Sequence, residues 1–195
     1  MNDFSIWFGL GFGHIMEPGA LDHILFLILL AVTYGSALWR KTLLLLLGFT
    51  LGHTLSMLLS VLFALKLPAS LIEFTIALSI VITALTALLG KPQKNFAVLL
   101  AVISVFGCVH GLGFSMALRS LLSTNNTLVL PLLYFNLGLE VAQIIIVVVV
   151  VLGFSLFLTS YSKIPETTYK YVIICTTGLI ALSIAAQRFW QLFFV

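Results

Sequence analysis

Six long apolar runs dominate this chain, at about 20–38, 43–64, 69–89, 96–118, 129–153 and 170–190. Each is close to the roughly 20 residues that an α-helix needs to cross the hydrocarbon core of a bilayer. The segments between them are short, and only 8% of the 195 residues are charged, which excludes a soluble domain. We therefore predict an all-α, polytopic transmembrane bundle that forms one domain over residues 1–195.

A shorter apolar segment at 4–13 precedes the first run, and we expect it to lie on the membrane or dip into it. The first residues carry no positive region and no clear cleavage site, so we expect no cleavable signal peptide. The basic residues then predict the orientation, because cytoplasmic loops are enriched in Lys and Arg. One set of loops carries six bases and the opposite side three, which predicts that both termini lie outside.

All four histidines, and four of the six acidic residues, lie in or beside these apolar runs. A charged side chain near the bilayer centre costs about 2.5–3.5 kcal/mol even on mild insertion scales, so such residues usually mark a site or a pathway. At about 1.5 Å of rise per residue, their positions fall between the outer surface and the midplane, with Asp22 and His23 at the outer surface. We predict a polar cluster in the outer half of the bundle.

The first polar segment runs from His14 to the pair Asp22-His23, with a Pro18-Gly19 turn between them. Asp22 falls in the first turn of a helix, where the helix dipole favours an anion. A structural cap with an interfacial histidine is the alternative to a binding site. The histidines on both sides of Asp22 favour the binding site.

Two further histidines stand beside small residues. His53 has Thr50 and Ser56 nearby on its helix, and His110 follows Gly107 and precedes Gly111. Small residues at four-residue spacing allow a neighbouring helix to approach closely. Each histidine is therefore expected at a helix–helix contact, either as a metal ligand or as a hydrogen-bonding group.

Two carboxylates complete the set. Glu73 has no basic neighbour in sequence, so it needs a metal, a proton, a distant partner or a position near the interface. Glu140 shares a helix face with Asn136 and Gln143, at i, i+4 and i+7. Asn136 and Gln143 suit an interhelical hydrogen-bond ladder, whereas an ionised Glu140 needs a counter-charge.

Imidazoles combined with carboxylates suit nickel, cobalt, zinc or copper, whereas magnesium and calcium prefer oxygen ligands. The predicted cofactor or cargo is therefore a divalent transition metal. The candidate ligands are His14, Asp22, His23, His53, Glu73, His110 and Glu140, with supporting polar groups at Thr50, Ser56, Asn136 and Gln143.

These segments, in this order, resemble those of the HupE/UreJ family of small bacterial membrane proteins. The resemblance rests on the stretches around Asp22-His23, His53, Glu73, His110 and Asn136 to Gln143, within about 14–143. It implies a metal permease of the bacterial inner membrane, chiefly for nickel and also for cobalt. The His and Asp-His pattern also looks like that of larger nickel/cobalt transporters, but seven residues separate His14 from Asp22 here, against four there.

Three classes of function remain open. We favour a transporter, and the alternatives are an intramembrane zinc-dependent hydrolase or a non-catalytic metal-binding protein. No phosphate-binding loop is present, and the bases are scattered rather than clustered, so neither ATP hydrolysis nor nucleic-acid binding is expected. The expected partners are the lipid bilayer and the metal ion, with a homo-oligomer or a metal-delivery protein as further candidates.

Overall fold

Seven helices make up the computed structural model, which describes residues 3–17, 19–34, 39–65, 67–89, 95–122, 129–161 and 165–194. The described residues contain no strand, so the predicted all-α class is confirmed. The helices are α1 (Asp3–Met16), α2 (Leu21–Tyr34), α3 (Trp39–Leu62), α4 (Ala69–Leu88), α5 (Phe96–Leu122), α6 (Val129–Tyr161) and α7 (Glu166–Phe194).

Five of these helices, α3 to α7, are long and apolar enough to cross a membrane, and each overlaps one predicted run. The first predicted run, 20–38, differs. Its described helix α2 has 14 residues and is therefore about 21 Å long, short of a hydrocarbon core of about 30 Å. Helices α1 and α2 meet at 74° across a short break, and together they qualify as a sixth, broken span. The chain is a multi-pass membrane protein.

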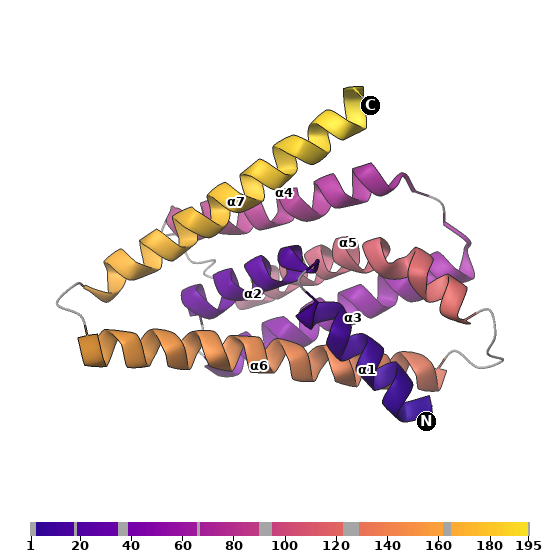
Figure 1. Ribbon diagram of the computed structural model, residues 1–195, viewed down its shortest axis with the longest axis horizontal. Helices are drawn as coiled ribbons and strands as arrows, with labels where there is room; N and C mark the ends of the chain where they lie inside the picture. Colours follow the sequence, from indigo (N-terminus) through magenta and orange to yellow (C-terminus); the bar gives the residue numbers. More distant parts are fainter. Residues whose placement is uncertain are drawn as a thin grey trace.

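The helices associate in three pairs, α3 with α5, α1 with α6 and α4 with α7, while α2 lies among them (Figure 1). The last turns of α2, α4 and α6 and the first turns of α3, α5 and α7 lie at one end of the bundle (Figure 1). The last turns of α3 and α5 and the first turns of α1, α4 and α6 lie at the opposite end, while α1 and α2 meet between the two ends (Figure 1). This alternation agrees with an up-and-down path, and the side of the membrane on which the termini lie stays a prediction.

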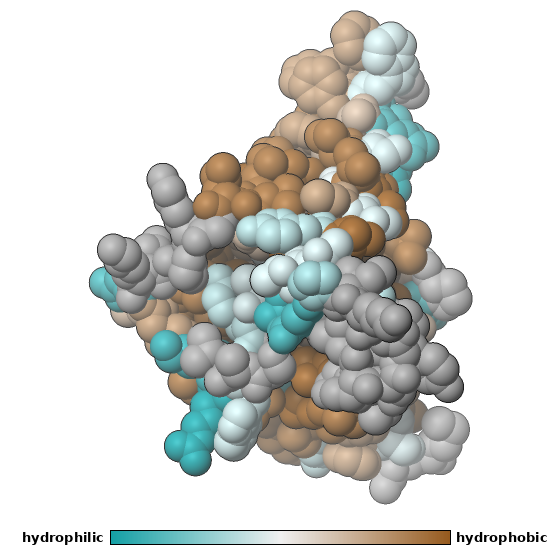
Figure 2. Space-filling view, turned by 90° about the vertical axis from the view of Figure 1, so that its left-hand side faces the viewer, coloured by the Kyte–Doolittle hydropathy of each residue, from teal (hydrophilic) through white to brown (hydrophobic). Residues whose placement is uncertain are grey.

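Helix α2 is buried on most of its circumference. Phe26, Leu29 and Leu30 have no exposed surface, and the helix contacts α3, α4, α6 and α7. An apolar surface all round is what a helix in the centre of a bundle requires. By contrast, the flanks of the outer helices expose large apolar side chains to lipid. Figure 2 shows one end of the bundle, where hydrophilic residues gather between hydrophobic flanks.

Helices α3 and α5 touch through their backbones. A Cβ atom on Gly107 would collide with the carbonyl oxygen of Phe49, and one on Gly111 with that of His53. Close approach at small residues is how membrane helices gain packing energy without a hydrophobic driving force. The tight packing expected from the glycine spacing is therefore present, and it fixes His53 next to α5.

We expect Gly107→Ala to destabilise the protein by about 1–3 kcal/mol, because the added methyl group overpacks the α3–α5 contact. Thermal unfolding in detergent measures this loss. The matched control is Gly153→Ala on α6, where an added Cβ meets nothing within 4 Å. Equal melting temperatures for both variants would contradict the tight contact.

Candidate metal centre

The four histidines come from four different helices and meet at one level of the bundle. His14 lies in the last turn of α1, His23 in the first turn of α2, His53 in α3 and His110 in α5. His53 and His110 each stand 14 residues after the first residue of their helix, Trp39 or Phe96. Both therefore lie about 21 Å from the same end of the bundle.

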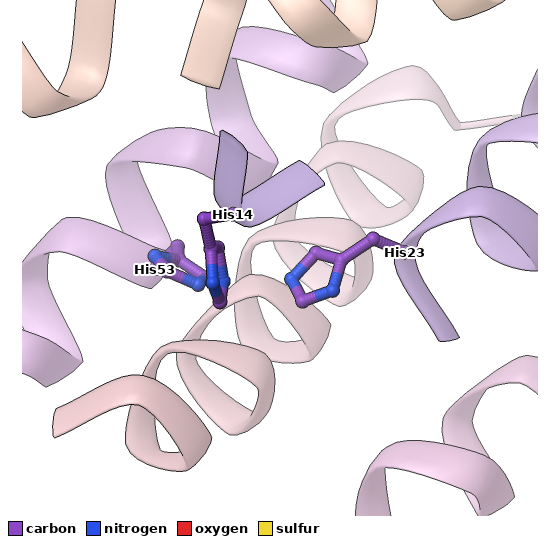
Figure 3. Close-up of side chains that lie close together, drawn as sticks. All are labelled: His14, His23 and His53. Atoms are coloured by element: carbon purple, nitrogen blue, oxygen red, sulfur yellow. The ribbon is translucent and has the colours of Figure 1, made fainter. Parts of the chain in front are cut away.

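Three of the rings converge on a common space (Figure 3). His14, His23 and His53 each offer a ring nitrogen, and these three atoms lie within 4.8 Å of one another. The centroid of the His14 ring is 4.9 Å from that of His23 and 5.6 Å from that of His53. Three imidazoles at this separation can coordinate one transition-metal ion.

A second group shares a member with the first. Ligand atoms of Asp22, His23 and His110 also lie within 4.8 Å of one another. The ring centroids of His23 and His110 are 5.0 Å apart. We call the combined set of His14, Asp22, His23, His53 and His110 the His cluster. His23 belongs to both of its groups and thus lies at its centre.

Asp22 holds the His23 ring in place. One carboxylate oxygen of Asp22 lies 2.9 Å from Nδ1 of His23 and also accepts the His23 backbone N–H at 2.8 Å. When Nδ1 donates its proton to that carboxylate, Nε2 keeps a free lone pair. Nε2 of His23 is buried and has no hydrogen-bond partner among the described residues. Metal-binding histidines typically have this arrangement, in which a carboxylate accepts the proton of the other nitrogen.

Ser79 of α4 plays the same part for His110. The Ser79 hydroxyl donates its only proton to the carbonyl of Ile76 at 2.7 Å. With the hydroxyl proton on that carbonyl, Nε2 of His110, 3.1 Å from the same hydroxyl oxygen, donates to it. Nδ1 of His110 then keeps a lone pair, and this atom is buried without a partner in the described part of the chain.

The remaining histidines have further buried nitrogens without partners. These are Nε2 of His14 and both ring nitrogens of His53, again counted over the described residues. Buried polar atoms are hydrogen-bonded in more than about 90% of cases, and each unsatisfied one costs about 1–3 kcal/mol. Several orphaned nitrogens in one place are difficult to explain by packing. A bound cation would take up their lone pairs, and a neutral His53 keeps a proton on one of its two nitrogens.

Two stacked phenylalanine pairs enclose the His cluster. Phe26 and Phe49 stack at 4.9 Å between centroids, and the Phe49 ring lies 5.1 Å from that of His110. Phe114 and Phe135 stack at 5.1 Å, and the Phe114 ring lies 4.3 Å from that of His14. These rings give the His cluster an apolar surrounding, in which an ion would exchange its hydration shell for imidazole and carboxylate ligands.

The structure corrects the predicted depth of Asp22 and His23. We expected them at the outer surface, at the start of the first span. They lie instead beside His53 and His110, because α1 packs into the bundle and places them at the break before α2.

Glu73, predicted as a ligand, is not brought into the His cluster. Its carboxylate forms a 3.1 Å ion pair with Arg188 of α7, and both side chains are partly exposed. The distant partner that the sequence required for Glu73 is therefore a base on another helix. This pair joins α4 to α7 and leaves the metal ligands to other helices.

The polar face of α6 attaches to α3 beside His53. Asn136 accepts a hydrogen bond from Thr54 at 2.6 Å, and Gln143 bonds to Thr50 at 3.1 Å. These are the interhelical bonds expected for Asn136 and Gln143. Glu140 lies between them and also interacts with Thr50, and one of its buried oxygens has no partner among the described residues.

Ser56 was predicted as a supporting polar group and Glu140 as a metal ligand. Ser56 donates a hydrogen bond to the carbonyl of His53 at 3.0 Å and so supports the α3 backbone at the His cluster. Glu140 belongs to neither group of potential ligands, so its part in metal binding stays a prediction.

Sequence reasoning missed Ser79 and the phenylalanine pairs. Ser79 stands on the stretch that follows Glu73, where only the carboxylate was singled out. Its spacing from His110 in the sequence carries no signal, because the two meet only when α4 and α5 pack together. Phenylalanines are too frequent in this chain for four of them to stand out.

Comparison with known proteins adds one match. A family model described as HupE / UreJ protein matches residues 1–192, nearly the whole chain. Neither a curated protein nor a solved structure matches it.

We expect Asp22→Ala to weaken Ni²⁺ binding by about 10- to 100-fold, because His23 loses the carboxylate that orients its ring. Calorimetric titration of the purified protein with nickel chloride measures this change. Glu73→Gln is the control and should bind as the unchanged protein does. A comparable loss in both variants would mean that the His cluster is not the principal site.

Proposed function

The chain belongs to the HupE/UreJ family, and on that premise we propose that it is a permease for a divalent transition metal. Ni²⁺ or Co²⁺ is the proposed cargo and the bacterial inner membrane the proposed location. The metals follow from the family, whereas the ligands alone would also suit zinc or copper.

The His cluster is the observation that carries this proposal. It brings imidazoles from four helices together inside a membrane protein, with ring nitrogens that lack partners in the described part of the chain. Polar and ionisable groups inside a membrane usually mark an ion pathway. A site between helices, rather than within one helix, also suits a protein that must open and close around its cargo.

The two overlapping groups of ligands support stepwise passage. An ion bound by His14, His23 and His53 could exchange His14 and His53 for Asp22 and His110 while His23 remains bound. The ion would then never lose all its protein ligands at once, which keeps each step small. Release requires a change in helix positions or protonation of the ligands, since imidazoles bind metal only when neutral.

An intramembrane zinc hydrolase is the main rival, because three histidines and a water can form a catalytic zinc site. Such an enzyme also needs a carboxylate free to act as a base near the bound water. Within the two ligand groups of the described residues, the one carboxylate is Asp22, which is bonded to His23. The uptake experiment below separates the two functions.

Uptake of Ni²⁺ into proteoliposomes tests the proposal. The unchanged protein should give saturable uptake, and His53→Ala or His110→Ala should lower its rate by about tenfold or more, because each loses a ligand. Glu166→Gln, which affects only the exposed pair with Lys170, is the control and should transport normally. Tight stoichiometric metal binding without uptake would overturn the proposal and favour an enzyme or a structural site.

A further inference from the structure

A cavity of about 430 Å³ lies along α1 and reaches the His cluster at His14. Its lining consists of one face of α1 and a single residue of α5, Phe114. We call this cavity the α1 groove. Two other cavities, lined by residues such as Tyr34 and Lys170 or Trp39 and Leu43, contain no member of the His cluster.

Small residues create the α1 groove. Ser5, Gly9, Gly13 and Glu17 follow one another at four-residue spacing and therefore lie on one face of α1. A Cβ atom added to Gly9 or Gly13 would meet nothing within 4 Å. These two glycines thus serve no close helix contact. Gly11 does, because its Cβ would collide with the backbone of Phe135.

The groove is large enough for a hydrated ion. Six water molecules at about 30 Å³ each occupy roughly 180 Å³, less than half of the space available. A metal ion could therefore travel along α1 with its hydration shell intact. It would lose that shell only on reaching the imidazoles.

Glu17 supplies a negative charge in the groove wall, directly beside the His cluster. The residue is exposed, and the ion pairs of the described residues do not include it. It stands three residues after His14, so the two side chains are neighbours across one helical turn. A carboxylate in contact with lipid would be strongly unfavourable, so a groove open to water is the surrounding that suits Glu17.

The two ligands suit successive states of the ion. A carboxylate oxygen binds a hydrated divalent cation readily, whereas imidazole suits a transition metal that has shed its waters. Carboxylate and imidazole on adjacent turns would therefore pass the ion from the groove to the His cluster without a long gap. Phe114 lines the groove and also contacts His14, so it lies at the point of transfer.

We propose that the α1 groove is the entry path for the hydrated metal ion, with Glu17 as its first ligand and His14 as the next. This inference rests on the proposed transport function and adds a route and a capture residue to it. The proposal separates the rate of entry from the affinity of the His cluster, and the two can be measured independently.

Filling the groove tests the route. Gly13→Leu should lower the initial rate of Ni²⁺ uptake into proteoliposomes by roughly tenfold, since diffusion along α1 is blocked, while Ni²⁺ binding at equilibrium in detergent stays unchanged. Gly153→Leu is the matched control, because its added side chain also enters open space but lies outside the groove. A Gly13→Leu protein that transports like the control would overturn the proposed route.

A cysteine variant keeps this test valid if the leucine variant does not fold. Gly13→Cys, reconstituted first and then treated with a charged thiol reagent, should lose uptake only after treatment, and dissolved Ni²⁺ should slow the labelling. Gly153→Cys is the control: it also contains the native Cys108 and Cys175, so it measures labelling and loss of uptake that do not come from the groove. Labelling of Gly13→Cys without any loss of uptake would contradict the proposal.

The capture residue has its own signature. Glu17→Gln should raise the KM for Ni²⁺ uptake by roughly tenfold and leave kcat unchanged, because the charge that concentrates the cation is lost while the His cluster is intact. Glu17→Asp keeps the negative charge, so its KM for Ni²⁺ uptake should lie close to that of the unchanged protein. If the unchanged protein transports and Glu17→Gln has a normal KM, the capture role fails while the proposed function stands. If the unchanged protein shows no uptake, the proposed function itself fails.

Discussion

A bilayer provides no water to polar groups, and this constraint governs the centre of the structure. Every polar atom that the chain places between its apolar helices needs a partner within the protein. Asp22 and Ser79 meet that need for one nitrogen each of His23 and His110. The nitrogens left over in the described part of the chain lie close together, and a cation bound between them would take up the lone pairs of several of them at once. The metal-binding interpretation therefore follows from the polar atoms that find no hydrogen-bond partner in the described part of the bundle.

The fold positions these groups by bringing backbones unusually close. Glycines on α3 and α5 allow the two helices to touch, and Gly11 and Gly138 do the same for α1 and α6. Because the helix backbones are close, the imidazole rings of the His cluster can reach one another from different helices. Hydrogen bonds of Thr50 and Thr54 with Gln143 and Asn136 attach the two pairs to each other beside His53. The phenylalanine pairs pack against the rings of His14 and His110.

Hydropathy predicted the long spans well, because a helix of about 20 apolar residues has few alternatives in a membrane. It also singled out all the histidines of the His cluster, since a polar residue in an apolar run is conspicuous. It did not show that α1 and α2 meet at an angle of 74°, because hydropathy does not report a bend. It could not place Glu73, whose partner Arg188 lies more than a hundred residues away in sequence. Pairings of this kind depend on which helices meet, and one sequence does not encode that in any local pattern.

The backbone contact between α3 and α5 has a mechanical consequence. Two helices in contact along their main chains are difficult to separate, so the contacts of α3 with α5 set the spacing of His53 and His110. The same kind of contact holds α1, which carries His14, to α6, whereas none of the described glycines makes such a contact with α2, which carries His23. A change in the geometry of the His cluster therefore alters the distances between these pairs and to His23, and the backbone contacts within each pair can persist.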